Sequence, residues 1–147
     1  MSATDAFETA LLGLIFTNAD AANVGDATGL RGSSTAGVFW ISLHTGAGPA
    51  DAGDQTTNEA AYSGYGRESE ARSTAGWTVA GDTVDNDNAI TFGQSADGPE
   101  TLTTFGIGSA ETTAGNLFMH GDLTDDLVVN AGITPSFAAG DLDVTLD

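Results

Sequence analysis

The chain has 147 residues, and its 21 acidic side chains face three arginines and no lysine, which gives a formal net charge of −18. This balance argues against a nucleic-acid partner, because phosphate binding requires clustered lysine or arginine. The longest apolar run, residues 10–16, is far shorter than the roughly 20 residues of a membrane span, and no basic segment precedes it. We therefore expect neither nucleic acid nor membrane as a partner. Without cysteine, disulfides and thiolate chemistry are excluded.

The acidic residues are distributed over the whole chain and comprise 15 aspartates but only six glutamates. Such a surface repels itself in dilute buffer, whereas at 1 M salt the Debye length shrinks to about 3 Å and the repulsion is screened. The absence of lysine together with the excess of aspartate is similar to the composition of salt-adapted proteins. We interpret the chain as a protein from a halophilic setting, and an ordinary acidic protein is the alternative.

An amphipathic helix is predicted over residues 4–18. Thr4 is a suitable N-cap, and apolar side chains recur at helical spacing at Phe7, Leu11 and Ile15. The apolar face of this helix has two alternative uses. It closes one end of a β core, or it docks on another subunit.

Short strands are predicted for the rest of the chain, and no helix can be written after residue 18. The strongest is Val38–Thr45, whose sequence VFWISLHT is rich in β-branched and aromatic residues. The others are 76–80, 83–84, 89–92, 102–107, 116–123, 127–130, 133–137 and 142–146. Strands at this spacing, separated by Gly and Asp turns, indicate an antiparallel β-sandwich or jelly-roll-like fold. We expect one all-β domain over residues 1–147, with the N-terminal α-helix at 4–18 and the β-sandwich at 38–147.

Several segments together resemble a family of small virion proteins of tailed bacteriophages and their archaeal relatives, usually labelled tail-fibre-like or head-decoration proteins. The resemblance covers most of the chain. It is carried by the helical segment DAFETALLGLIF, the strand VFWISLHT, the element Tyr62–Arg67 and, near the C-terminus, Phe105–Gly108, Gly115–Phe118, His120–Leu123 and Phe137–Leu142. The chain departs from the family pattern in its charge, in Gly66 where alanine is usual, and in the long loop 46–58.

This resemblance implies a virion structural protein, synthesised in the host cytoplasm. The interpretation we favour is a capsid decoration subunit, of the cement or turret type, on the surface of a tailed virus of a halophilic host. It would be a homo-oligomer bound to other virion proteins, foremost the major capsid protein. The alternative is a tail-fibre or baseplate-associated protein that contacts the host.

No catalytic residue can be nominated, and we expect the protein not to be an enzyme. Nucleophilic catalysis needs a base beside the nucleophile, and the histidines available are His44 and His120. Both fall within predicted strands, where a hydrogen-bonded imidazole on a sheet face is the simpler interpretation. Pairs of carboxylates at catalytic spacing have no weight as evidence, because some pair among 21 acids meets that spacing by chance.

Three aspartates, Asp82, Asp85 and Asp87, cluster in the segment GDTVDNDNA. The spacing lacks the twelve-residue loop and closing glutamate of a calcium site, so a hairpin turn is the favoured interpretation. Weak binding of a divalent cation is the alternative. No other metal or cofactor is expected.

Three aromatic residues, Tyr62, Tyr65 and Trp77, could form a flat platform for sugar rings. This platform would make the chain a carbohydrate-binding module, which is the second alternative function. The competing interpretation places these side chains in the core.

Two of the three arginines, Arg67 and Arg72, are expected to lie against carboxylates, because cations are scarce in this chain. Their partners are predicted to be neighbours such as Glu68 and Glu70, or acids across a subunit boundary. The candidate interface residues are therefore Phe7, Leu11, Ile15, Arg67 and Arg72.

Overall fold

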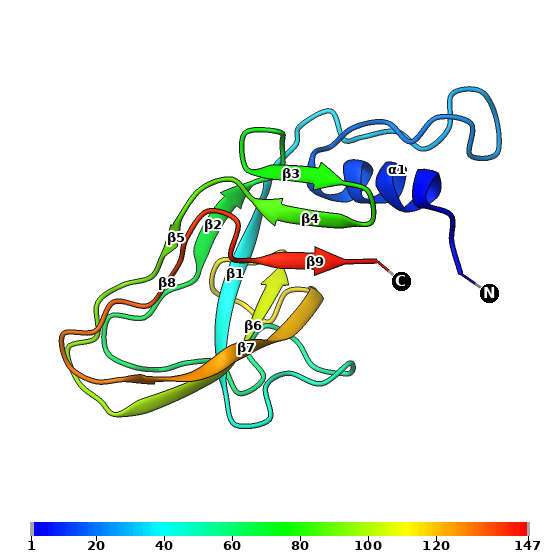
Figure 1. The fold of residues 1–147 in the computed structure, drawn as a ribbon. Helices are drawn as coiled ribbons and strands as arrows, with labels where there is room; N and C mark the ends of the chain where they lie inside the picture. Colours follow the sequence, from blue (N-terminus) through cyan, green and yellow to red (C-terminus); the bar gives the residue numbers. More distant parts are fainter. Residues whose placement is uncertain (1, 147) are drawn as a thin grey trace. The chain divides into compact units, whose positions relative to one another are not determined.

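The computed structural model describes residues 2–146, which form antiparallel β-sheets and one N-terminal helix (Figure 1). The elements are α1 (Asp5–Phe16), β1 (Val38–Thr45), β2 (Glu68–Ala71), β3 (Trp77–Ala80), β4 (Thr83–Asn86), β5 (Ile90–Thr91), β6 (Glu100–Gly108), β7 (Leu117–Val129), β8 (Ser136–Phe137) and β9 (Asp143–Thr145). The predicted fold class, all-β with a single N-terminal helix, is confirmed.

Backbone contacts divide the chain into two compact units. The helix unit contains the residues up to Val38, Glu70–Ala89, and the residues from Phe137 onward. The sheet unit contains Phe39–Ser69 and Ile90–Ser136. The assignment of residues 1–147 to one domain stays a prediction.

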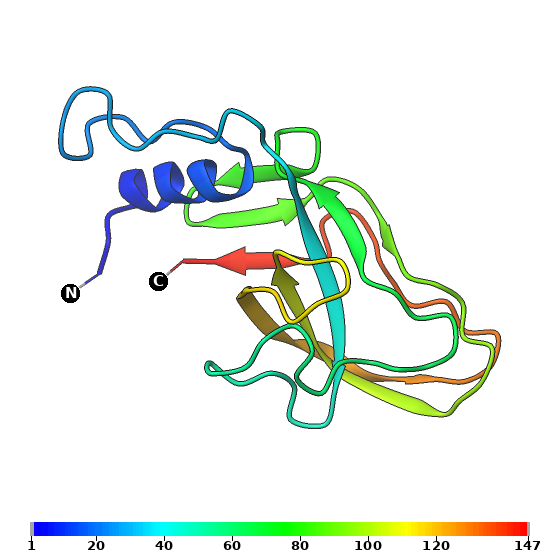
Figure 2. The same ribbon diagram turned by 180° about the vertical axis from the view of Figure 1, so that it is seen from behind.

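In the helix unit, α1 packs against β3 and β4 of a three-stranded sheet with the order β3-β4-β9 (Figures 1 and 2). Leu12 and Phe16 are the apolar side chains that α1 buries, and the Phe16 ring meets the Trp77 ring edge-on with centroids 4.8 Å apart. Thr4 has the extended backbone of an N-cap, but its side chain makes no capping hydrogen bond. The Thr4 side chain therefore does not stabilise the N-terminal end of the helix by capping.

Arg72 caps the C-terminal end of α1. Its guanidinium donates hydrogen bonds to the backbone carbonyls of Leu14 and Ile15 and to the side-chain oxygen of Asn18. Carbonyls in the last turn of a helix have no partner within the helix, and a cation there also opposes the negative end of the helix dipole. The prediction that Arg72 pairs with a carboxylate such as Glu70 is therefore wrong, because the helix end supplies the acceptors.

The hairpin between β3 and β4 turns at Gly81 and Asp82. Gly81 has φ of 68°, a conformation that glycine adopts without steric strain, and the flanking residues Ala80 and Thr83 are paired. The predicted hairpin is confirmed, although Asp85 lies within β4 and not in the turn.

The four-stranded sheet has the order β2-β1-β6-β7, and most of it lies in the sheet unit. Its central strands pair antiparallel with Ile41 opposite Ile107, and both side chains are buried. The bounds of β1 agree with the predicted strand Val38–Thr45. Strand β2 was not predicted, because its sequence ESEA has no apolar alternation and the strand lies at a sheet edge.

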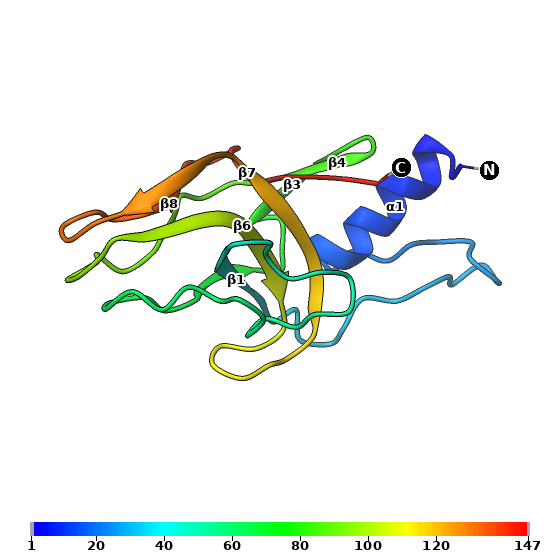
Figure 3. The same cartoon turned by 90° about the horizontal axis from the view of Figure 1, so that it is seen from below.

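The predicted turn at residues 124–126 is wrong, because β7 continues through it (Figure 3). Thr104 of β6 pairs with Asp122 and Leu102 pairs with Leu127, so residues 123–126 lie opposite the single residue Thr103. A bulge thus absorbs the extra residues while pairing resumes on both sides. The sequence Thr-Asp-Asp by itself favours a turn, but the backbone pairing with β6 on both sides keeps this segment within β7.

The long loop 46–58 is anchored by a buried glutamine. The side chain of Gln55 donates from Nε2 to the Trp40 carbonyl (3.2 Å) and accepts at Oε1 from the Ala110 backbone amide (2.9 Å). The backbone amide of Gln55 also donates to the Ala114 carbonyl. This loop, which departs from the family pattern, is therefore held by specific hydrogen bonds within the sheet unit.

Candidate functional site

The most concentrated polar cluster of the sheet unit is built around Arg67, whose side chain is only 2% exposed. Nε and Nη2 donate to the two carboxylate oxygens of Glu59 at 2.6 and 2.8 Å. Nη1 donates to the backbone carbonyls of Ala110 and Thr113 at 2.6 and 2.8 Å. The guanidinium therefore joins the segment that leads into β2 to the loop between β6 and β7.

Tyr65 completes this cluster. Its hydroxyl donates to Glu59 Oε1 (2.9 Å) and accepts from the backbone amide of Leu43 (3.1 Å). Burial raises the pKa of Tyr65, so the phenol stays protonated. Burial alone would lower the pKa of Arg67, but hydrogen bonding and the charge of Glu59 outweigh it and raise that pKa. The cluster is a charge-paired interior and holds no free reactive group.

The predicted intrachain ion pair of Arg67 is confirmed, but its partner is Glu59 instead of Glu68 or Glu70. Glu59 is eight residues away in the sequence and follows a loop, so no spacing rule pointed to it. An intersubunit function of Arg67 or Arg72 stays a prediction, while within the chain both guanidiniums already bind acceptors.

Ser42 and His44 form a buried hydrogen-bonded pair on one face of β1. Ser42 Oγ lies 2.8 Å from His44 Nε2, and His44 Nδ1 lies 3.0 Å from the Thr57 carbonyl. The carbonyl can only accept, so it places the imidazole proton on Nδ1, and Ser42 donates to Nε2. Burial lowers the pKa of His44 and favours the neutral ring. Although serine beside histidine is a catalytic combination, both side chains are fully buried and out of reach of a substrate.

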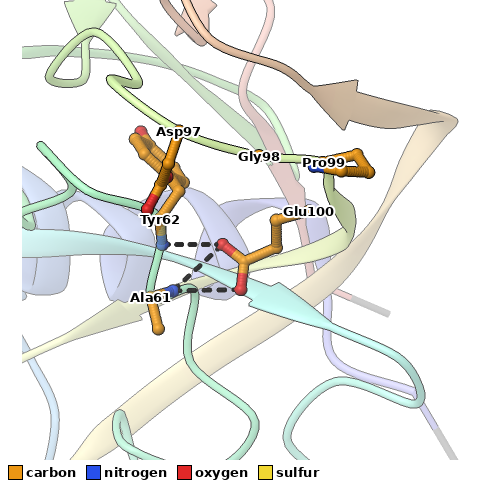
Figure 4. Close-up of a pocket in the computed structure, with 6 residues that line it drawn as sticks. All are labelled: Ala61, Tyr62, Asp97, Gly98, Pro99 and Glu100. Atoms are coloured by element: carbon orange, nitrogen blue, oxygen red, sulfur yellow. Dashed lines mark hydrogen bonds between the residues drawn. The ribbon is translucent and has the colours of Figure 1, made fainter.

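A shallow hollow of about 260 Å³ lies where the segment after β1 passes the loop before β6 (Figure 4). Its lining residues are Ala61, Tyr62, Asp97, Gly98, Pro99 and Glu100. The Glu100 carboxylate accepts hydrogen bonds from the backbone amides of Ala61 and Tyr62, and Asp97 accepts one from Ser63. Burial raises the pKa of Tyr62 to about 12, and its hydroxyl donates to the Gly93 carbonyl. Because these carboxylates already bind the backbone, the hollow resembles a structural anchor more than a reaction centre.

The structure does not gather Asp82, Asp85 and Asp87 into a ligand set. Within residues 2–146, no group of three or more acidic or histidine side chains is arranged to hold a metal ion. Asp85 lies opposite Asp143 of β9, and hydrogen bonding to that carboxyl raises the pKa of Asp85. Asp87 accepts a hydrogen bond from Thr78 instead. Asp85 lies within β4, whereas Asp82 precedes the strand and Asp87 follows it, and Asp85 and Asp87 bind the different partners Asp143 and Thr78.

The predicted aromatic platform for a sugar is not formed. Trp77 and Tyr62 are buried, the first against Phe16 in the helix unit and the second within the sheet unit. Tyr65 stacks on Phe92 with ring centroids 6.3 Å apart. The competing interpretation, that these aromatic side chains belong to the core, holds for Trp77 and Tyr62. Without this platform, the three aromatic residues give no support to a carbohydrate-binding module.

Among the candidate interface residues, Phe7 is 44% exposed, and Leu11 and Ile15 are half-buried. His120, the second histidine, is exposed on β7 with Nε2 3.4 Å from the Asp51 carboxylate. None of the described helices is long and apolar enough to cross a membrane.

The described residues form a β scaffold in which the buried Arg67 and the Glu100 carboxylate bind partners within the chain. A family model described as "Podophage GP4 fiber I protein gp80" matches residues 2–145. The chain belongs to this family and is therefore a phage virion structural protein of the tail-fibre-like kind. No curated protein matches the sequence. The resemblance noted from the sequence is thus confirmed.

Replacing Arg67 with methionine is expected to destabilise the protein by about 3–5 kcal/mol, because it leaves the Glu59 carboxylate without its buried partner. Urea unfolding measures the change. The control is Arg31→Met, whose ion pair with Asp20 is solvent-exposed and whose loss should leave the unfolding midpoint nearly unchanged. Adding Glu59→Gln to Arg67→Met should recover part of the loss. Equal midpoints for the two single variants would contradict this account.

His44 predicts a pH dependence of stability. Its folded-state pKa lies below the unfolded value of about 6.5, so the unfolded chain binds more protons in the window between them. Stability is full above about pH 6.5 and falls as the pH drops toward the folded-state pKa, by up to about 1.4 kcal/mol per pH unit. Urea unfolding between about pH 7.5 and pH 5 measures the slope.

The pH slope should be smaller in His44→Gln than in His120→Gln, which removes the other histidine. The comparison is needed because Asp85 and Glu68, whose pKa values are raised, contribute with the opposite sign. The same slope in both variants would show that His44 does not titrate on unfolding.

Proposed function

We propose that the protein is a fibre subunit of a tailed virus, located at the tail fibre or baseplate, where it contacts the host. The observation that carries this proposal is the family match over residues 2–145, whose description names a fibre protein. The capsid-decoration interpretation, favoured from the sequence alone, has less support, because no observation on the chain points to the head. The major capsid protein would be its partner only under that interpretation.

A non-catalytic function is part of the proposal. It is supported by the polar pairs in the sheet unit, since the Ser42 and His44 pair is buried and the Glu100 carboxylate binds backbone amides. A scaffold protein needs rigidity and a surface and requires no activated group. We expect no resident cofactor, and at most weak binding of a divalent cation by the surface aspartates.

We also propose that the virus infects a halophilic host. The support is the net charge of −18 and the absence of lysine. In addition, all three arginines make hydrogen bonds within the chain. Asp85 and Asp143 lie on paired positions of β4 and β9, so their repulsion is part of the folded state. Molar salt would screen such like-charge contacts at the surface.

The location in the virion is tested by immunogold electron microscopy of intact particles with an antibody against this chain. A fibre subunit should be labelled at the tail region and be present in tens of copies or fewer. Purified protein should also compete with virions for adsorption to the host. Gold label over the whole head, with copies in the hundreds per particle, would instead establish capsid decoration.

The salt dependence is tested by thermal unfolding at about 0.1 M and 2 M NaCl. We expect Tm to rise by more than about 4 °C, the shift that roughly 1 kcal/mol produces in a chain of this size. Glycine betaine at equal osmolality is the control, because it favours the compact state without screening charge. A Tm that is unchanged by salt would overturn the halophilic assignment.

A further inference from the structure

Strand β7 is an edge of the four-stranded sheet, because β6 is its only neighbour there. Among residues 2–146, no hydrogen bond joins the backbone of its first half, residues 117–122, to a segment other than β6. This half has the sequence LFMHGD, without the proline or lysine that usually protects an exposed edge. The second half is protected by the bulge at residues 123–126 and by Asp125 and Asp126.

The hydrogen bonds of β1 establish the direction of the backbone groups in β6. The Leu43 amide donates to the Tyr65 hydroxyl and the Leu43 carbonyl accepts from the Ala60 amide, so both Leu43 groups point away from β6. Leu43 lies opposite Phe105. In an antiparallel pair, opposite residues either exchange both hydrogen bonds or both face away from each other. The backbone groups of Phe105 therefore point toward β7.

The same rule gives the direction of the backbone groups in β7. Phe105 lies opposite Gly121, so the Gly121 amide and carbonyl point toward β6. Because directions alternate along a strand, His120 and Asp122 direct their amides and carbonyls away from β6. Both residues are exposed. Each thus presents one backbone donor and one acceptor at strand spacing, a pattern that an extended polypeptide satisfies.

We propose that an extended segment of another virion protein, in which apolar and basic residues alternate, adds to the sheet along residues 117–122 of β7. The backbone hydrogen bonds of His120 and Asp122 would hold this added strand. Because the chain belongs to a virion protein family, the partner is assigned to the virion. The contact goes beyond the proposed location, since it requires neither the tail nor the head.

The two faces of β7 determine the side chains of the added strand. Met119 and Gly121 share one face and are half-buried, which favours apolar neighbours. On the other face, Asp122 is exposed, and the Asp51 carboxylate lies 3.4 Å from His120. Opposite charges on neighbouring strands stabilise a sheet, so lysine or arginine fits this face. Alternation of apolar and basic residues satisfies both faces at once.

A second copy of this chain is a poorer occupant of the edge. The chain has no arginine or lysine after Arg72, so its own β7 cannot supply basic side chains. The opposite edge of the sheet is β2, which has the acidic residues Glu68 and Glu70. Two chains of net charge −18 also repel each other. The edge therefore fits a basic partner strand better than it fits itself.

Binding of a synthetic peptide to the full chain tests the proposal. The probe has about eight alternating lysine and valine residues, which is longer than the roughly 20 Å of residues 117–122. Fluorescence anisotropy measures its affinity at about 1 M NaCl, where a Debye length of about 3 Å screens diffuse attraction to the acidic surface. Amide hydrogen exchange locates the bound peptide.

The amides of His120 and Asp122 should exchange at least about tenfold more slowly with the peptide than without it, because they become hydrogen-bonded. The Gly121 amide, which already faces β6, should change much less. No binding, or protection confined to other segments, would overturn the proposal. Slow exchange of the His120 and Asp122 amides in the chain alone, increasing with protein concentration, would identify a second copy as the occupant and would also overturn it.

Replacing His120 with proline tests the backbone contact. Proline has no amide hydrogen and is tolerated at the outward positions of an edge strand. His120→Pro should therefore weaken peptide binding at least about fivefold, the effect of one lost hydrogen bond. His120→Ala is the matched control, because it removes the imidazole and keeps the amide. Equal affinities of the two variants would refute strand addition.

Circular dichroism checks that His120→Pro is folded. If it is not, Asp122→Pro with the control Asp122→Ala gives the same comparison at the other outward position. Equal peptide affinities of this second pair would likewise refute strand addition.

The charge of the partner is tested at about 0.1 M NaCl. Asp122→Asn and the control Asp125→Asn each change the net charge from −18 to −17, so general attraction predicts the same small loss of peptide binding in both. Strand addition along residues 117–122 predicts a larger loss for Asp122→Asn, because Asp125 lies in the bulge. Equal losses would show that the edge does not select a basic strand.

Discussion

The ion pair between Arg67 and Glu59 is the interaction on which the sheet unit depends. A charge taken out of water is costly unless it is paired and hydrogen-bonded, and four of the guanidinium hydrogen bonds found here go to Glu59, Ala110 and Thr113. These groups come from two segments more than 40 residues apart, so the pair orders both together. Tyr65 bonds the same carboxylate and the backbone of β1, which extends the constraint to the central strand.

The other two arginines also bind acceptors within the chain. Arg72 binds the open carbonyls at the end of α1, and Arg31 holds Asp20 at the surface. The three cations are thus used within the chain, and the remaining carboxylates give the acidic surface. Membership in a fibre family implies contacts with other virion components.

The spacing of apolar residues predicted helices and strands well where one face of the element is buried. It predicted them poorly where pairing between distant segments determines the strand. The strand Val38–Thr45 and the helix were predicted within two residues, because each has an apolar face. The turn expected at residues 124–126 is a bulge, since β7 keeps its pairs with β6 on both sides. All residues of the edge strand β2 except Ala71 are polar, so the spacing of apolar residues could not predict this strand. For the candidate site, the scarcity of arginine correctly predicted that Arg67 pairs with a carboxylate, but it did not identify Glu59 as the partner.

The sequence by itself determined the class of fold, the acidic character and the family, because composition, periodicity and short motifs are local properties of the chain. Tertiary structure alone decided that Arg67 pairs with Glu59, that His44 is buried against Ser42, and that Trp77 belongs to the core. These outcomes depend on which distant groups become neighbours after water is removed. Their free energies come from desolvation and hydrogen bonding in the folded state, which no spacing along the chain encodes.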